Sequence, residues 1–283
     1  MFKNGLIFFF ILIISGSMNA QANLLNAKSV DQIGVKNEQQ IAADNDGPIP
    51  YGYVDDRDVL WSKVVWEFID LNQKINLPYY FPIDTTNMSS DRRSLFDTLI
   101  KGIKQGKIKD AYSDSFFTSK ITQGEIDSRM TSVREENGYK DIVRLQTQDV
   151  EGYMIKGIWY FDKRQGELKY RLLALAPMGK DVQTIGTDIE DEELYELFWV
   201  FFPSTRNVLH DAKVFNPKNA SHPISFDHLL NARRFSGVIV REENVYGNRK
   251  ISDYVRGNSL FQLLEANKIK EDVRNREMDM WNY

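Results

Sequence analysis

The densest run of apolar positions in the chain lies in residues 57–82, RDVLWSKVVWEFIDLNQKINLPYYFP. Its polar residues Lys63, Glu67, Asp70 and Lys74 are spaced i, i+4, i+7 and i+11, which places them in one narrow stripe of a helix. The other positions are apolar around most of the circumference, and a helix of that kind is buried on several sides. The pattern therefore predicts a helix at the centre of the fold.

The two ends of this segment agree with a helix. Asp58 can accept hydrogen bonds from the first free backbone amides, and Pro78 disfavours helical geometry at Leu77. We expect about four helical turns, followed by an extended aromatic segment from Pro78 to Pro82.

Helical spacing returns in three later segments. The first follows the capping residues at 89–91 and ends at Gly102 and Gly106; the second, residues 225–235, begins at Ser225. The third runs from residue 252 to about residue 280 with an interruption at Gly257, and its second half is almost entirely charged. The apolar residues that define the first are Leu95, Phe96, Leu99, Ile100 and Ile103.

Strand patterns dominate the region between these helices. Residues 151–161 and 168–176 are joined by a polar, glycine-containing loop, which predicts an antiparallel hairpin that Pro177 ends. Residues 197–202 are apolar at every position and predict a strand buried on both faces, ending at Pro203. We expect a partner strand over residues 208–215 and another strand from Val238 to Val240.

These segments together predict an α+β fold, in which helices pack on a mostly antiparallel sheet. We divide the chain into a signal peptide (residues 1–20), an extended or flexible N-terminal arm (21–56), a core domain (57–250) and a C-terminal helix with a charged tail (251–283).

The first residues have the pattern of a secretory signal peptide. Lys3 precedes an apolar run from Leu6 to Ile14, and small residues follow up to Ala20 and Ala22. We expect cleavage after Ala20. The apolar run is shorter than the roughly 20 residues that span a bilayer, so a retained membrane anchor is the less favoured alternative.

The chain contains no cysteine. The exported protein therefore has no disulfide and no lipidation site, a combination that favours a bacterial protein over one from a eukaryotic secretory pathway. The arm after the signal peptide has few apolar groups and no sustained period, which favours either a disordered linker or a segment that orders on a partner. In the second case its anchors are Ile49, Tyr51, Tyr53 and the pair Leu24 and Leu25.

Charge and aromatic content narrow the class of partner. The formal net charge is −4, which does not favour nucleic acid. Aromatic residues make up 12% of a chain that is 27% charged. This combination is typical of a protein that buries surface against partners, although an aromatic-rich core explains it equally well.

The sequence offers few residues for catalysis or metal binding. Without cysteine, thiol catalysis and cysteine-ligated zinc are excluded. The chain has no HExxH, GxSxG, P-loop, GxGxxG or EF-hand pattern. A metal site formed by His222, Asp227 and His228 is disfavoured, because Pro223 places His222 in a loop whereas His228 lies inside a predicted helix. The third histidine, His210, forms no metal-ligand spacing with the other two.

Three charged features leave alternatives open. The acidic run 188–193 is expected to be the solvated start of a helix rather than a calcium site. Arg233 and Arg234 can bind a carboxylate or phosphate in bidentate fashion, or lie at the surface with one of them reaching an internal acid. Paired carboxylates of a glycoside hydrolase stay open, because Asp and Glu are too numerous for the sequence to select two.

Four segments carry a resemblance to a known family: VLW at 59–61, EFIDLNQK at 67–74, NLPYYFP at 76–82 and FDHLLNARRFSGVIV at 226–240. With these segments the chain resembles the GldN/PorN family of gliding-motility and type IX secretion proteins from Bacteroidetes. The resemblance covers most of the mature chain, and the matching motifs are structural rather than catalytic.

The resemblance implies a non-catalytic periplasmic scaffold subunit. Such a subunit assembles into a ring with an outer-membrane lipoprotein of the GldK/PorK type, and it contacts the inner-membrane motor proteins GldL and GldM. Membrane attachment would be indirect, in keeping with the missing lipidation cysteine. No cofactor, metal or catalytic residue is implied.

A scaffold subunit is expected to bind its partners through aromatic anchors. The candidates are Tyr51, Tyr53, Trp61, Trp66, Tyr79 and Tyr80. Each tryptophan can instead be buried in the chain's own core. The alternative functions are a secreted hydrolase of cell-envelope glycans and a periplasmic ligand-binding module.

Overall fold

The structure is a computed structural model that describes residues 47–83, 92–136, 139–185, 193–214 and 224–280. From Pro48 onward these residues belong to one compact unit, made of Pro48–Thr85 and Arg92–Tyr283. The predicted signal peptide, most of the arm and most of the acidic run 188–193 lie outside the described residues.

The strands are β1 (Val59–Asp70), β2 (Ala111–Tyr112), β3 (Lys120–Ile121), β4 (Thr131–Glu136), β5 (Tyr139–Arg144), β6 (Val150–Asp162), β7 (Glu167–Gly179), β8 (Tyr195–Glu196), β9 (Trp199–Phe201), β10 (Lys213–Val214), β11 (Ile224–Ser225) and β12 (Val238–Glu242). The helices are α3 (Leu77–Tyr80), α4 (Leu95–Lys104), α5 (Gln123–Arg129), α6 (Phe202–Asp211), α7 (Phe226–Asn231), α8 (Ile251–Tyr254) and α9 (Ser259–Met280). Short 3-10 helices are η2 (Asp56–Asp58), η3 (Lys74–Asn76) and η4 (Thr147–Asp149).

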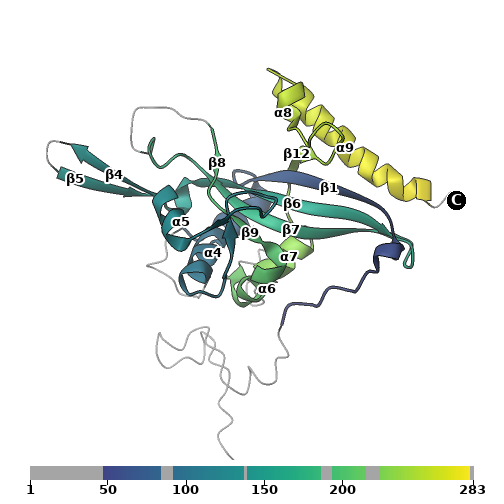
Figure 1. Ribbon diagram of the computed structural model, residues 1–283, viewed down its shortest axis with the longest axis horizontal. Coiled ribbons are helices and arrows are strands. Elements are labelled where there is room, and N and C mark those ends of the chain that lie inside the picture. The colour runs from purple at the N-terminus through teal and green to yellow at the C-terminus, as the bar shows by residue number, and fades with distance from the viewer. Residues whose placement is uncertain (1–46, 84–91, 137–138, 186–192, 215–223, 281–283) are drawn as a thin grey trace, which may run out of the picture. The chain divides into compact units, whose positions relative to one another are not determined.

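A large antiparallel sheet forms the centre of this unit (Figure 1). Its strand order is β12-β1-β6-β7-β9-β2-β3, and β8 pairs with the end of β7. Strands β4 and β5 form a separate hairpin, and β10 and β11 a short ladder. Helices α4, α6 and α7 cover one face of the sheet, whereas α8 and α9 pack at the β12 edge. The predicted α+β fold with a mostly antiparallel sheet is confirmed.

The prediction of an opening helix is wrong, because Val59–Asp70 forms strand β1. This is an inner strand, paired with β12 on one side and β6 on the other. Val65 and Ile69 pack into clusters on the helix-covered face, and Trp66 packs into the cluster on the opposite face. A strand buried on both faces is apolar at nearly every position, so its period cannot be told from that of a buried helix.

The composition of β1 indicates a strand, although its hydrophobic period does not. Most of its apolar residues are β-branched or aromatic, which favours a strand. The apparent polar stripe has a different origin, since Lys63 pairs with Glu242 and Glu67 pairs with Arg233 across the fold. The predicted extended segment at 78–82 is also wrong over its first part: Leu77–Tyr80 is helix α3, with Pro78 in the first turn, where proline is tolerated.

The later helices are confirmed, with one difference in capping and one in extent: helix α7 ends at Asn231 and not at residue 235. Helix α4 is capped by Ser94, whose hydroxyl accepts a hydrogen bond from the backbone N–H of Asp97 at 3.2 Å, rather than by residues 89–91. Gly102 lies inside α4, where a Cβ would be only 2.8 Å from Cδ1 of Ile108; the helix ends before Gly106, which has φ of +68°. Ser225 caps α7, and Gly257 separates α8 from α9, as expected.

The strand predictions are confirmed for β6, β7 and β12. The strand expected over 197–202 is shorter, because β9 contains only Trp199–Phe201 and Phe202 begins helix α6. Two further details are corrected. Strand β7 continues through Pro177, which lies between the residues that pair with β9 and those that pair with β8, where a missing N–H is tolerated. The partner strand expected over 208–215 is mostly helix α6, because Pro203 occupies the first helical turn. The strands beside β9 are β7 and β2 instead.

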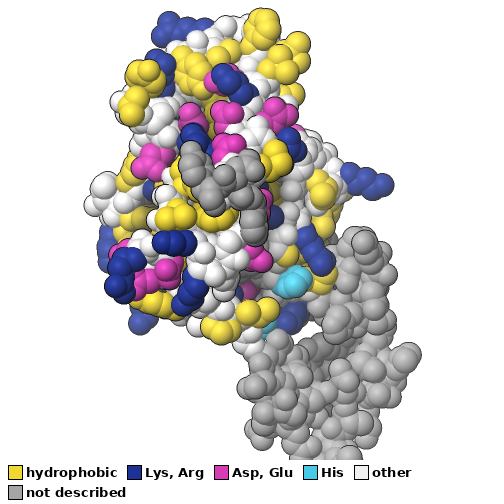
Figure 2. Space-filling view, turned by 90° about the vertical axis from the view of Figure 1, so that its right-hand side faces the viewer, with side chains coloured by type: hydrophobic (Ala, Val, Ile, Leu, Met, Phe, Trp, Pro, Cys, Tyr) yellow, Lys and Arg dark blue, Asp and Glu magenta, His cyan; other side chains and the backbone are white. Residues whose placement is uncertain are grey.

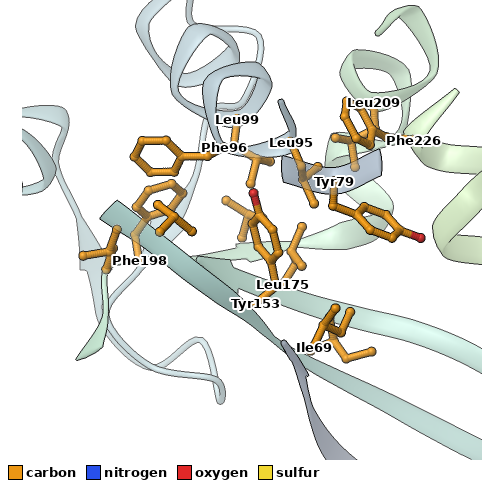
Figure 3. Packing of buried hydrophobic residues seen from close by; sticks show 14 of the residues in the cluster. Ile69, Tyr79, Leu95, Phe96, Leu99, Tyr153, Leu175, Phe198, Leu209 and Phe226 are labelled. Carbon is orange, nitrogen blue, oxygen red and sulfur yellow. The ribbon is translucent and has the colours of Figure 1, made fainter. Parts of the chain in front are cut away.

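The main hydrophobic core lies between the sheet and the helices (Figure 3). Leu95 and Leu99 of α4 point toward Tyr153 and Leu175 of the sheet, and Tyr79 of α3 lies in the same cluster. All five side chains are at most 1% exposed. The helices are therefore held to the sheet by continuous apolar packing, which is the dominant favourable term in folding.

A second core lies on the opposite face of the sheet, around Trp66. Trp66 is 3% exposed and is flanked on neighbouring strands by Lys156 and Arg241. The Nζ atom of Lys156 lies 5.1 Å from the Trp66 ring centroid and 4.6 Å from that of Phe116, and it donates a hydrogen bond to the Ser115 carbonyl. Burial lowers the pKa of the Lys156 ammonium group. Trp66 thus belongs to the interior of the chain.

The position of Trp66 gives the first testable prediction. Trp66→Ala should lower the free energy of unfolding by about 3 to 5 kcal/mol, because it empties the centre of the second core. Leu60→Ala on the same strand is the control, since Leu60 is 51% exposed and its loss should change stability little. Urea denaturation of both variants measures the difference. A Trp66→Ala variant as stable as Leu60→Ala would contradict the core assignment.

Candidate functional site

Residues 49–54, which we call the strap, line one side of a pocket of about 540 Å³ beside α6, α7 and the β6–β7 hairpin. The pocket walls carry aromatic, basic and polar side chains. They include Tyr160, Lys169, Tyr170, Arg171, Arg206, Asp227, His228 and Asn231. The strap is the only described part of the predicted N-terminal arm apart from its flanking residues 47–48 and 55–56, and it lies on the chain's own core.

Three arginines hold the backbone of the strap. The Nη2 atom of Arg206 donates to the carbonyl of Ile49 at 2.7 Å, and Nη2 of Arg171 donates to the carbonyl of Gly52 at 3.1 Å. Arg164 donates to the carbonyl of Tyr53 at 3.3 Å. These three hydrogen bonds therefore bind the backbone of the strap and not its side chains.

Tyr51 is the side chain that fixes the strap in place. The guanidinium carbons of Arg206 and Arg171 lie 4.2 and 4.6 Å from its ring centroid, and its hydroxyl donates to Oδ1 of Asn231 at 2.9 Å. Burial raises the pKa of the Tyr51 phenol, although Arg206 acts in the opposite direction. The phenol therefore stays protonated at neutral pH and keeps its hydrogen bond to Asn231.

The arginine that contacts Tyr51 is held by a bidentate ion pair. Arg206 Nε and Nη2 donate to the two carboxylate oxygens of Asp227 at 2.7 and 3.0 Å, and the two side chains are 11% and 5% exposed. Asn231 Nδ2 donates to Oδ1 of the same carboxylate at 2.8 Å. This network joins α6 to α7 and presents a rigid surface to the strap, since bidentate pairs fix the geometry of both partners.

The same ion pair bears on the metal site considered from the sequence. Both oxygens of Asp227 are engaged by Arg206, so this carboxylate is committed to a cation within the chain. Over the described residues, no group of three or more His, Asp or Glu side chains is placed to hold a metal ion. His222 lies outside the described residues.

A second buried ion pair crosses the centre of the fold. The Nη1 and Nη2 atoms of Arg233 donate to Oε1 and Oε2 of Glu67 at 3.0 and 2.8 Å. Glu67, on inner strand β1, has a side chain only 4% exposed. Burial tends to lower the pKa of the Arg233 guanidinium, but the Glu67 carboxylate outweighs that effect and the pKa is raised. Arg233 therefore binds an internal acid, one of the two interpretations that the sequence left open.

Aromatic rings surround Arg233. Its guanidinium carbon lies 4.0 Å from the ring centroid of Tyr170, 5.0 Å from that of Phe235 and 5.1 Å from that of Trp159. The backbone of Arg233 has φ of +49°, which is uncommon for a residue with a side chain and marks the turn after α7. Tyr170 lies directly over Gly157, where a Cβ would be only 2.1 Å from the Tyr170 hydroxyl. Gly157 therefore leaves the space that this aromatic wall requires.

The six predicted interface residues occupy four different environments. Trp66 and Tyr79 are 3% and 1% exposed and lie in the chain's own cores, so the structure corrects their assignment as surface anchors. Tyr51 is anchored in the pocket of the same chain, and Tyr53 is 77% exposed. Trp61 and Tyr80 are half-buried, at the start of β1 and in α3.

Several residues of the site escaped the sequence analysis. Arg171, Arg206 and Asn231 come from three separate elements, and no spacing in the sequence connects them. Asp227 and Asn231 are four residues apart on one helix, a spacing that places them on the same face. Glu67 was assigned to a polar helix stripe, and its partner lies 166 residues away.

Exposed apolar residues gather on two surfaces outside the pocket. On the β4–β5 hairpin, Val133 and Ile142 are cross-strand neighbours and are 59% and 65% exposed. On the first turns of α9, Leu260, Phe261 and Leu264 are 61%, 57% and 53% exposed. Clustered apolar groups on a surface indicate contact with a partner. None of the described helices is long and apolar enough to cross a membrane.

Comparison with known proteins identifies a family. A family model described as "Gliding motility associated protein GldN" matches residues 54–282. A search of curated proteins found no match. The matched range includes the end of the strap, the whole of the large sheet and helix α9.

The Glu67 pair gives a prediction about two neighbouring arginines. Arg233→Lys keeps the charge but loses the forked contact with Glu67, and should lower the free energy of unfolding by about 1 to 3 kcal/mol. Arg234→Lys is the matched control, because Arg234 is exposed and adjacent in sequence. Chemical denaturation compares the two variants. Equal free energies of unfolding for the two variants would show that the forked contact between Arg233 and Glu67 adds no stability.

The strap gives a prediction about two neighbouring tyrosines. Tyr51→Ala removes two cation–π contacts and one hydrogen bond, and should make strap opening easier by about 1 to 3 kcal/mol. Tyr53→Ala, two residues along and exposed, should leave strap opening unchanged. Limited proteolysis within residues 49–54 measures the opening. Faster cleavage in both variants, or in neither, would contradict the role given to Tyr51.

Proposed function

The chain belongs to the GldN family of gliding motility associated proteins, and from this premise we propose that it is a non-catalytic structural subunit of the type IX protein secretion and gliding motility machinery. The observation that carries the proposal is the family match, which extends over residues 54–282 and so includes nearly all of the described fold.

In this proposal the N-terminal signal peptide exports the chain to the periplasm. There it forms a ring with an outer-membrane lipoprotein of the GldK/PorK type, and the ring contacts inner-membrane motor proteins of the GldL and GldM type. The lipoprotein supplies the membrane attachment, because this chain has no cysteine to carry a lipid.

The β4–β5 hairpin supports a role in assembly. One face of the hairpin is held by the chain itself: Arg134 Nη2 donates to the carbonyls of Gln183 and Ile185 at 2.7 Å each, and Val143 packs against the main core. The other face presents Val133 and Ile142 to solvent. A two-stranded sheet is marginally stable by itself. A partner that covers Val133 and Ile142 would complete its burial.

We assign this hairpin face to the lipoprotein partner. The hairpin is fixed to the chain on one face and is apolar and exposed on the other. Protein interfaces likewise have an apolar centre with polar surroundings. The pocket beside the strap is not assigned this role, because the chain's own residues 49–54 form one of its walls.

Co-purification tests the proposed assembly. The full chain, expressed in its native envelope and solubilised gently, should purify in a large particle that contains the GldK/PorK-type lipoprotein, identified by mass spectrometry. The double variant V133E/I142E should keep the thermal stability of the unmodified chain but lose at least about tenfold of the co-purified lipoprotein, since each buried charge costs several kcal/mol.

Val245→Glu is the control, because Val245 is 91% exposed in a loop. Undiminished co-purification with V133E/I142E would overturn the hairpin assignment. An unmodified chain that is recovered as a lone monomer, or that cleaves cell-envelope glycans, would overturn the proposed function itself.

A further inference from the structure

Helix α9 has two apolar faces, and the chain itself covers one of them. Ala266, Ile269 and Val273 are 3% to 4% exposed, and α9 packs on β12. At about 100° per residue, Leu260, Leu264 and Met278 lie on the opposite side of the helix. These three are 61%, 53% and 62% exposed. A helix that is apolar on two sides is normally buried on both.

The uncovered face continues along the whole helix as a regular seam. Its positions are alternately four and three residues apart, which is the spacing of a helix–helix seam in a coiled coil. All of them are exposed in this chain. They are Leu260, Leu264, Asn267, Glu271, Arg274 and Met278.

Hydrophobic side chains are also visible at the top of Figure 2, over the region where α8 and the start of α9 lie in Figure 1. Phe261 and Leu263, which flank the seam, are 57% and 43% exposed and widen its apolar end. The seam is therefore apolar at its start, polar in the middle and apolar again at Met278.

We propose that this seam binds the same seam of a second copy of the chain, with the two α9 helices antiparallel. The spacing is symmetric about residue 269, so an antiparallel copy brings unlike positions together. Leu260 faces Met278, Leu264 faces Arg274, and Asn267 faces Glu271, each pair occurring twice.

The charges of the seam favour this direction. In the antiparallel arrangement the Asn267 amide can donate a hydrogen bond to the Glu271 carboxylate of the other copy. The methylene groups of Arg274 can cover Leu264 while the guanidinium reaches solvent. A parallel arrangement in register would instead place Glu271 against Glu271 and Arg274 against Arg274, and such like-charge contacts are destabilising.

The pairing is a property of the isolated chain and does not rest on the proposed secretion function or on the lipoprotein. If the chain pairs through α9 but does not bind the lipoprotein, the proposed function is wrong and the α9 pairing stands. If the chain assembles with the lipoprotein but does not pair through α9, the pairing is wrong and the proposed function stands.

Single cysteines provide a direct test, because the chain has none of its own. Two variants of the full mature chain, L260C and M278C, are purified separately, mixed at micromolar concentration and treated with a short bismaleimide cross-linker. A preformed pair holds its two thiols at an effective concentration of about millimolar. The mixture should therefore give at least about tenfold more cross-linked dimer than either variant alone.

Controls separate the possible outcomes. V245C, exposed in a loop, measures random collisions. Adding Leu264→Glu to both cysteine variants should abolish the cross-link without loss of thermal stability, because Leu264 is exposed in the single chain. Cross-linking of L260C with itself would overturn the antiparallel direction. A mixture that cross-links no better than V245C, together with a monomer mass by light scattering, would overturn the pairing.

Discussion

The bidentate pair of Glu67 and Arg233 is the constraint on which the rest of this fold depends. Glu67 lies on an inner strand, 3% exposed, where an unpaired carboxylate would be strongly destabilising. Its partner Arg233 lies in the turn after α7, so the ion pair holds this turn against β1. The next strand, β12, pairs with β1. Tyr170 and Trp159, from β7 and β6, enclose the guanidinium and bring the central hairpin into the same contact.

This constraint also places the strap pocket. Helix α7, fixed at its end by Arg233, carries Asp227 and Asn231, and these two residues hold Arg206 and Tyr51. The strap is thus bound to a platform that the ion pair has already positioned. Surfaces that face away from this platform, on the β4–β5 hairpin and on α9, are left apolar and uncovered. The arrangement suits a subunit whose core is rigid and whose periphery binds other proteins.

Local signals in the sequence predicted much of the fold. Ser225 as a cap, Gly257 as a break and the polar loop between β6 and β7 each act within a few residues, and each prediction is confirmed. Strand β1 was mistaken for a helix because burial on both faces removes the alternation that marks a strand. The ion pairs of Glu67 and Arg206 could not be predicted, because their partners are distant in sequence and become neighbours only in the folded chain.

The central claim, a rigid core with peripheral surfaces for partners, is tested most directly by hydrogen–deuterium exchange of the chain alone and within the proposed particle. We predict new protection in residues 131–144, with unchanged protection around Glu67 and Arg233 and in α9, whose pairing belongs to the isolated chain. Protection confined to residues 49–54, with the hairpin unchanged, would contradict the claim.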